Sequence, residues 1–95
     1  MNLPYIQSEL FRQLVGIHEL LNSECATRIT KDIDTSVNFE LYDFSKVKTS
    51  GKWRRVMFRR VDPSKINTAD QIIAEINRIW QEIPAECKRI TPEKS

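Results

Sequence analysis

The sequence has 95 residues but only two glycines, two cysteines and one histidine. The single histidine, His18, and the nearby Cys25 cannot supply the four ligands of a closed zinc site. No serine or cysteine nucleophile has a readable base partner. The letters SGK, ending at Lys52, match the last part of a phosphate-binding loop motif, but Trp53 follows where that motif needs serine or threonine. The sequence therefore predicts no catalytic site, no cofactor and no metal.

Long apolar runs are also missing. No stretch approaches the roughly 20 apolar residues that a membrane-spanning helix needs. The first residues lack the basic start and continuous apolar run of a signal peptide. We therefore expect a cytoplasmic protein with no membrane partner. Cys25 and Cys87 lack the spacing of a metal or redox motif, so we expect reduced thiols. The sequence leaves open whether these two cysteines pair.

Positive charge is concentrated in the middle of the chain. Residues 36–65 contain eight basic and three acidic residues, a net charge of +5. Residues 1–35 contain three basic and five acidic residues (net −2), and residues 66–95 contain four and five (net −1). Between Lys46 and Arg60 there are seven cations and no acid. Such an uneven distribution is typical of a protein with an anionic partner.

Helical periodicity occurs towards both ends of the chain. Between residues 4 and 25, apolar residues recur at steps of three or four positions: Ile6, Leu10, Leu14, Ile17 and Leu21. A second helix is predicted to begin after Thr68, which forms a capping-box motif with Gln71, and to end at Pro84. Residues 84–95 are short and polar, so we expect them to form a frayed tail.

Alternating residues in the centre of the chain predict a β-hairpin over residues 37–61. Residues 37–44 and 53–61 have the pattern of strands, and Gly51 suits the turn between them. Their closeness in sequence favours antiparallel pairing. Residues 26–36 are ambiguous. Their β-branched side chains favour a loop or a short edge strand, and an extra turn of the first helix is the third possibility.

The predicted order is helix, possible strand, strand, strand, helix. This order indicates a single α+β domain over residues 1–95. The N-terminal and C-terminal helices are expected to pack on one face of a small antiparallel sheet of two or three strands. A chain of this length can bury roughly two-thirds of its unfolded surface, which is enough for one core between two layers.

Side-chain alternation divides the predicted hairpin into two faces. We expect the helices to cover the cleaner apolar set: Val37, Phe39, Leu41, Val56 and Phe58. This set should pack against Leu14, Ile72 and Ile76. The opposite face and its connecting loop then carry aromatic rings, arginines and lysines. These are the candidate binding residues: Tyr42, Phe44, Lys46, Lys48, Lys52, Trp53, Arg55, Met57 and Arg59.

The candidate face has a composition that suits nucleic-acid binding, because rings stack on bases and guanidinium groups bind phosphates. Our first expectation is a small, non-catalytic accessory protein that binds nucleic acid through this basic aromatic hairpin. Tryptophan, tyrosine, methionine and arginine are also enriched at protein interfaces. The alternative is a protein–protein interaction module (an inhibitor, an antitoxin-like partner or an adaptor) or a homodimer. Arginines on an exposed strand also occur simply to block aggregation.

The stretch GKWRRVMFRRV, from Gly51 to Val61, is similar to the basic strand of ribosome-dependent RNA-cleaving toxins of the RelE/HigB type. The resemblance rests on glycine, tryptophan and arginine residues. It ends at Val61, because the toxins continue with further strands where a helix is predicted here. The resemblance implies an RNA-cleaving toxin as an enzymatic alternative to a non-catalytic binding protein.

Overall fold

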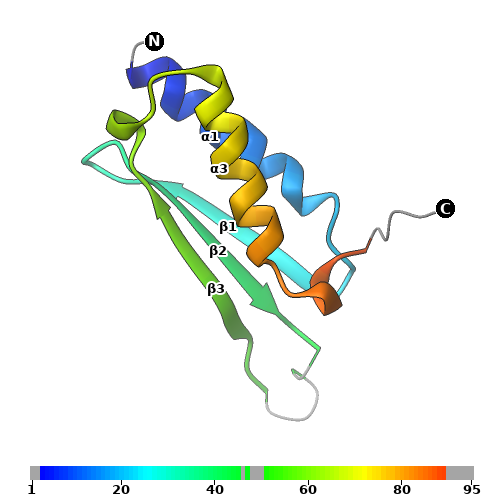
Figure 1. The fold of residues 1–95 in the computed structure, drawn as a ribbon. Helices are drawn as coiled ribbons and strands as arrows, with labels where there is room; N and C mark the ends of the chain where they lie inside the picture. Colours follow the sequence, from blue (N-terminus) through cyan, green and yellow to red (C-terminus); the bar gives the residue numbers. More distant parts are fainter. Residues whose placement is uncertain (1–2, 46, 48–50, 90–95) are drawn as a thin grey trace, which may run out of the picture.

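The computed structural model describes residues 3–45, 47 and 51–89. In these residues two helices and a three-stranded antiparallel sheet form an α+β fold, which confirms the predicted class (Figure 1). The sheet order β1-β2-β3 follows the chain. The elements are α1 (Leu3–His18), β1 (Cys25–Lys31), β2 (Val37–Asp43), β3 (Arg54–Val61), the short 3-10 helix η1 (Pro63–Lys65), α3 (Ala69–Glu82) and the 3-10 helix η2 (Ala85–Cys87).

The two helices form one layer and the sheet forms the other. Figure 1 shows α1 and α3 side by side on the same face of the sheet. Along its shortest axis the Cα trace extends 16 Å, which accommodates one layer of helix on one layer of strand. Among the residues that the structure describes, nothing covers the opposite face, which we call the open face.

The core lies between these layers and is built from periodic apolar positions. Along β2, buried and half-buried residues alternate, so that Val37, Phe39 and Leu41 are fully enclosed. The helices meet them with six buried side chains: Ile6, Leu10, Leu14, Ile17, Ile72 and Ile79. The predicted core positions in β2 are therefore confirmed, as are Leu14 and Ile72, while Ile76 is partly buried against the same cluster.

The predicted faces of β3 are wrong over most of the strand. Phe39 pairs with Arg59 and Leu41 pairs with Met57, so these two β3 residues lie on the covered face. Phe58 pairs with Glu40 on the open face and is 46% exposed. The expected burial of Phe58 is thus corrected, because a one-residue change of register moves every side chain of a strand to the other face.

A β-bulge returns the end of the hairpin to the predicted parity. The register shifts between Leu41 and Tyr42, so that Tyr42 pairs with Arg55 and the intervening Val56 is left unpaired. Val56 is partly buried against the core. A bulge inserts one extra residue into one of two paired strands. The alternating pattern of either strand alone does not show where this insertion lies.

The ambiguous segment after α1 is mainly a strand. The helix ends at His18, earlier than the predicted boundary near residue 25, and β1 forms an edge of the sheet. Its β-branched residues Thr27 and Ile29 pair with β2 across Leu41 and Phe39. Such residues suit a pleated surface better than a continued helix, which accounts for a strand in this segment.

The second helix begins and ends as predicted. The side-chain oxygen of Thr68 accepts a hydrogen bond from the backbone N–H of Gln71 at 3.2 Å, and the Gln71 side chain accepts one from the backbone N–H of Thr68 at 3.1 Å. This is a complete capping box. The helix ends at Glu82, and Pro84 follows its C-cap, Ile83.

The first part of the expected C-terminal tail is packed rather than frayed. Cys87 in η2 is 1% exposed, and Lys88 forms an isolated antiparallel bridge with Leu21. Cys87 is a small apolar residue, and burying it against the core holds the segment in place. Residues 90–95 lie outside the described residues.

Candidate binding surface

Three aromatic residues meet where β2 ends and β3 begins. The Trp53 ring lies edge-on to Phe44, with ring centroids 4.7 Å apart, and edge-on to Tyr42, at 6.0 Å. Edge-to-face contacts of this kind are favourable because the ring edge is positive and the face negative. Trp53 nevertheless remains 64% exposed. The Trp53 ring is therefore exposed to solvent while Tyr42 and Phe44 contact it from the side.

The centre of the open face is a carboxylate that two arginines share. Glu40 accepts a hydrogen bond from Arg55 at 2.9 Å, and Arg28 of β1 lies 3.9 Å away. The Arg55 guanidinium also lies 5.2 Å from the centroid of the Phe58 ring, a cation–π contact. Arg55 thus joins the central carboxylate to the exposed Phe58 ring. Since one carboxylate faces two arginines, this group keeps one net positive charge.

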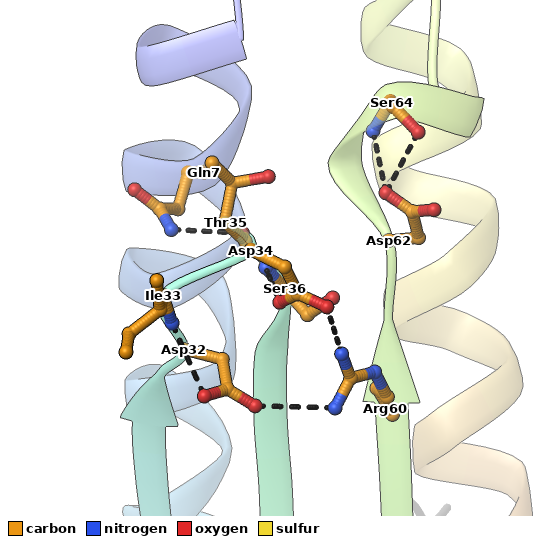
Figure 2. Close-up of polar contacts among 9 residues, drawn as sticks. All are labelled: Gln7, Asp32, Ile33, Asp34, Thr35, Ser36, Arg60, Asp62 and Ser64. Atoms are coloured by element: carbon orange, nitrogen blue, oxygen red, sulfur yellow. Dashed lines mark hydrogen bonds and ion pairs between the residues drawn. The ribbon is translucent and has the colours of Figure 1, made fainter.

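At the far end of the sheet, Arg60 is held by the turn between β1 and β2. It bonds Asp32 at 3.1 Å and forms a second ion pair with Asp34 (Figure 2). Asp34 also accepts a hydrogen bond from the Ser36 N–H, which is the main reason that its pKa is lowered, with Arg60 adding to the effect. Thr35 has a φ of 73° in this turn.

A contact from α1 supports the same turn. The side-chain amide of Gln7 donates a hydrogen bond to the Thr35 carbonyl at 2.8 Å, as Figure 2 shows. Farther along the chain, Asp62 accepts hydrogen bonds from the backbone and side chain of Ser64 where η1 begins, and these lower the pKa of Asp62. This end of the sheet is therefore held by several local hydrogen bonds, and Arg60 adds ion pairs to the turn between β1 and β2.

The other two β3 arginines are paired on the covered side. Arg54 lies 3.2 Å from Asp43, whose pKa is lowered mainly by the backbone N–H of Ser45 and further by Arg54. Arg59 reaches across to α3, where it lies 3.4 Å from Glu75 and forms an ion pair with Glu82. The hydrogen bond from Arg59 lowers the pKa of Glu82.

Each of the four arginines in β3 is therefore bound to at least one carboxylate of the same chain. Arg59 shows why an arginine is tolerated on the covered face. The strand is at the edge of the sheet, so the aliphatic part of the side chain packs near the core while its head reaches carboxylates on the helix. The arginines of β3 therefore link this strand to β2, to α3 and to the turn between β1 and β2, and they are not only a source of surface charge.

The predicted site residues divide into four groups. Tyr42, Phe44, Trp53 and Arg55 come together at one end of the hairpin. Met57 and Arg59 lie on the covered face, which corrects their placement among the open-face residues. Lys52 is exposed beside Trp53 in the sequence. The remaining two candidates, Lys46 and Lys48, lie outside the described residues.

Phe58 and Arg28 lie on the open face but were missing from the candidate set. Phe58 was expected in the core, and Arg28 stood in the ambiguous segment for which a loop or a short edge strand was favoured. Their positions follow from the pairing of Phe58 and Arg28 with Glu40. No local signal identifies them, because a register is a property of two strands together.

The described residues hold no group of three or more histidine, cysteine, aspartate or glutamate side chains placed to bind a metal ion. None of the helices in this part of the chain is long and apolar enough to span a membrane. Comparisons with protein-family models, with curated proteins and with solved structures find no match for this chain.

Proposed function

We propose that the chain is a small binding protein that binds a protein partner through the end of the hairpin where β2 leads into β3. The surface concerned, called the hairpin surface here, comprises Tyr42, Phe44, Trp53, Arg55 and Phe58. The observation that carries the proposal is the exposure of Trp53, 64% accessible although two other rings support it from the side. Tryptophan is one of the residues enriched at the energetic centres of protein interfaces, together with tyrosine and arginine.

The engagement of the arginines favours a protein partner over a phosphate backbone. Arg55 binds Glu40 at 2.9 Å and Arg60 binds Asp32 at 3.1 Å, so these carboxylates already neutralise much of the positive charge that attracts a phosphate. A protein partner depends less on that charge, because a paired arginine can still pack its flat guanidinium against a partner and donate its remaining hydrogens.

The charge of the hairpin surface indicates the chemistry of the partner. Arg28 and Arg55 share Glu40, which leaves one positive charge on the open face. A complementary protein has an apolar pocket for Trp53 and an acidic rim. Two copies of this chain, in contrast, oppose like charges if they meet through this surface, which disfavours a homodimer formed in that way.

Nucleic-acid binding is the second candidate. It is favoured by the exposed Trp53 ring within a segment that has seven cations and no acid between positions 46 and 60. Single-stranded nucleic acid stacks its bases on exposed rings, and its backbone is held by positive charge. In that case binding should depend on the lysines between positions 46 and 52 as well as on the arginines of β3.

The experiment compares the wild type with Trp53→Ala and with Ile73→Ala, a matched change of another exposed apolar residue, located on α3. Tagged proteins are used to capture partners from cells that produce the chain, with and without nuclease, followed by titration of the purified partner. We expect nuclease-resistant capture and a loss of at least about 2 kcal/mol of binding free energy in Trp53→Ala only.

Other outcomes decide between the candidates. Capture that nuclease abolishes supports the second candidate, as does binding of labelled single-stranded RNA with a log–log salt slope of about −0.7 per neutralised phosphate. Equal binding by the wild type and Trp53→Ala, to protein and to RNA, contradicts both.

A further inference from the structure

Two buried cysteines from distant parts of the sequence touch each other. The Sγ atoms of Cys25, at the start of β1, and Cys87, at the end of η2, lie 2.7 Å apart, although 62 positions separate the residues. Both are free thiols, 6% and 1% exposed. The sequence predicts reduced thiols but leaves open whether these two cysteines pair. Their contact allows a reaction between the two sulfurs that neither thiol could undergo alone.

Backbone contacts bring the two cysteines together. The N–H of Asn22 donates to the carbonyl of Cys87 at 2.9 Å, and the N–H of Arg89 donates to the carbonyl of Leu20 at 2.9 Å. The segment after α3 is thereby laid along the turn that follows α1. Because these bonds do not involve the sulfur atoms, the fold itself positions the thiols for reaction with each other.

One of the two cysteines lines a cavity. A cavity of about 450 Å³ is lined by Cys25 together with His18, Phe44 and Arg89, among others. Cys87 is not part of its lining. A small oxidant in this cavity therefore meets Cys25 first, with Cys87 behind it.

We propose that Cys25 and Cys87 are a thiol–disulfide site, which forms one intramolecular disulfide when the chain meets a small-molecule disulfide such as oxidised glutathione. The proposal is independent of what the hairpin surface binds. The disulfide ties the segment after α3 to the start of β1, and so adds a covalent bond where the backbone now has only hydrogen bonds.

The reaction is ordinary thiol–disulfide exchange. The Cys25 thiolate attacks one sulfur of the oxidant, forming a mixed disulfide and releasing one thiolate. The Cys87 thiolate then attacks the Cys25 sulfur of that mixed disulfide and releases the second. The two protons lost by the cysteines end on the two released thiols, so the cysteine pair is oxidised and the small disulfide is reduced. Contact between the sulfurs makes the second step intramolecular and fast.

The first step is slow in the folded protein. Burial, assisted by the contact with Cys87, raises the pKa of the Cys25 thiol to about 12. Few thiolates are present at neutral pH, and the thiolate is the reactive form. Oxidation of the folded protein is therefore slow at neutral pH and should become faster as the pH rises and more Cys25 thiolate forms.

The test equilibrates the reduced full chain with glutathione buffers of increasing oxidised fraction, blocks remaining thiols with N-ethylmaleimide under denaturing conditions, and measures intact mass. We expect the loss of both maleimide adducts together, a mass lower by two hydrogens, and no bound glutathione. Cys87→Ser, which keeps one thiol, should accumulate a glutathione adduct instead. Two thiols that stay reactive in fully oxidised buffer overturn the proposal, as do predominant glutathione adducts or linked dimers in the wild type.

Thermal melting of the wild type adds a readout that needs no variant to fold. A disulfide that closes a loop of this length within native geometry should raise the melting temperature by roughly 20 °C over the reduced form. An oxidised protein that melts at the same temperature or lower has a disulfide that the folded structure does not accommodate, and this outcome also overturns the proposal.

Discussion

The two faces of the sheet are stabilised in different ways. On the covered face, β2 contributes three side chains that solvent does not reach, Val37, Phe39 and Leu41. On the open face, the same strand contributes three half-buried ones, Asn38, Glu40 and Tyr42. Apolar burial is worth roughly 25 cal/mol per Å², whereas an exposed ion pair is worth about 0–1 kcal/mol. The covered face therefore supplies most of the stability, and the open face can change with little effect on folding.

The strand β3 carries this difference within eight residues. Val61 is buried and Met57 packs partly against the core, while Phe58 between them is 46% exposed. Near its start, the bulge at Val56 reverses the parity and places Arg55 beside Tyr42. A bulge at this point aims both Arg55 and Phe58 at the open face, which makes the arginine–aromatic contact there possible.

The largest effect should separate two phenylalanines. Phe39→Ala removes a fully buried ring and should cost about 3–5 kcal/mol, whereas Phe58→Ala removes a half-exposed ring and should cost about 1 kcal/mol or less. Urea unfolding of both variants measures the difference. Equal losses mean that the open face is covered in solution and that the comparison between the faces is wrong.

A smaller effect should distinguish two arginines of the same strand. Arg59, 27% exposed and bound to two carboxylates of α3, links the helix to the sheet edge. Arg59→Ala should cost about 1–2 kcal/mol, and Arg60→Ala less than about 1 kcal/mol, because Arg60 is more exposed. The same urea titration measures both. A larger loss in Arg60→Ala shows instead that the turn between β1 and β2 supports the fold more than α3 does.

A local effect is expected at the start of α3. Thr68→Ala removes the side-chain acceptor of the capping box and should cost about 1 kcal/mol, with faster amide exchange from Ala69 to Ile72. Thr68→Ser keeps the hydroxyl and serves as the matched control. Unchanged exchange in the alanine variant contradicts a stabilising role for this cap.

The smallest effect concerns pH. The pKa of Cys25 is raised from 9.0 to about 12 in the folded protein, so its contribution to stability is complete below pH 9.0 and is lost as pH rises towards 12. Reduced wild type should lose under about 1 kcal/mol of stability between pH 8 and pH 9.5 relative to Cys25→Ala, because only the unfolded thiol ionises in that window. Parallel pH curves for the two proteins contradict the raised pKa.

Local patterns predicted most elements of the fold. The apolar spacing of α1, the capping box at Thr68 and the alternation of Val37, Phe39 and Leu41 each depend on residues near one another in the chain. The aromatic end of the candidate site was predictable for the same reason, since Tyr42 and Trp53 flank a short connection. Phe58 was not, because its face depends on a register and a bulge that involve both strands.

By itself, the sequence determined the α+β class, the order of the elements and the concentration of cations around β3, because these follow from periodicity and composition. Tertiary structure alone decided what the cations do and what the cysteines face. Arg59 meets Glu82 and Cys25 meets Cys87 only after α3 and η2 fold back over the sheet. Contacts between residues so far apart depend on the packing of whole elements, and no short stretch of the chain contains that information.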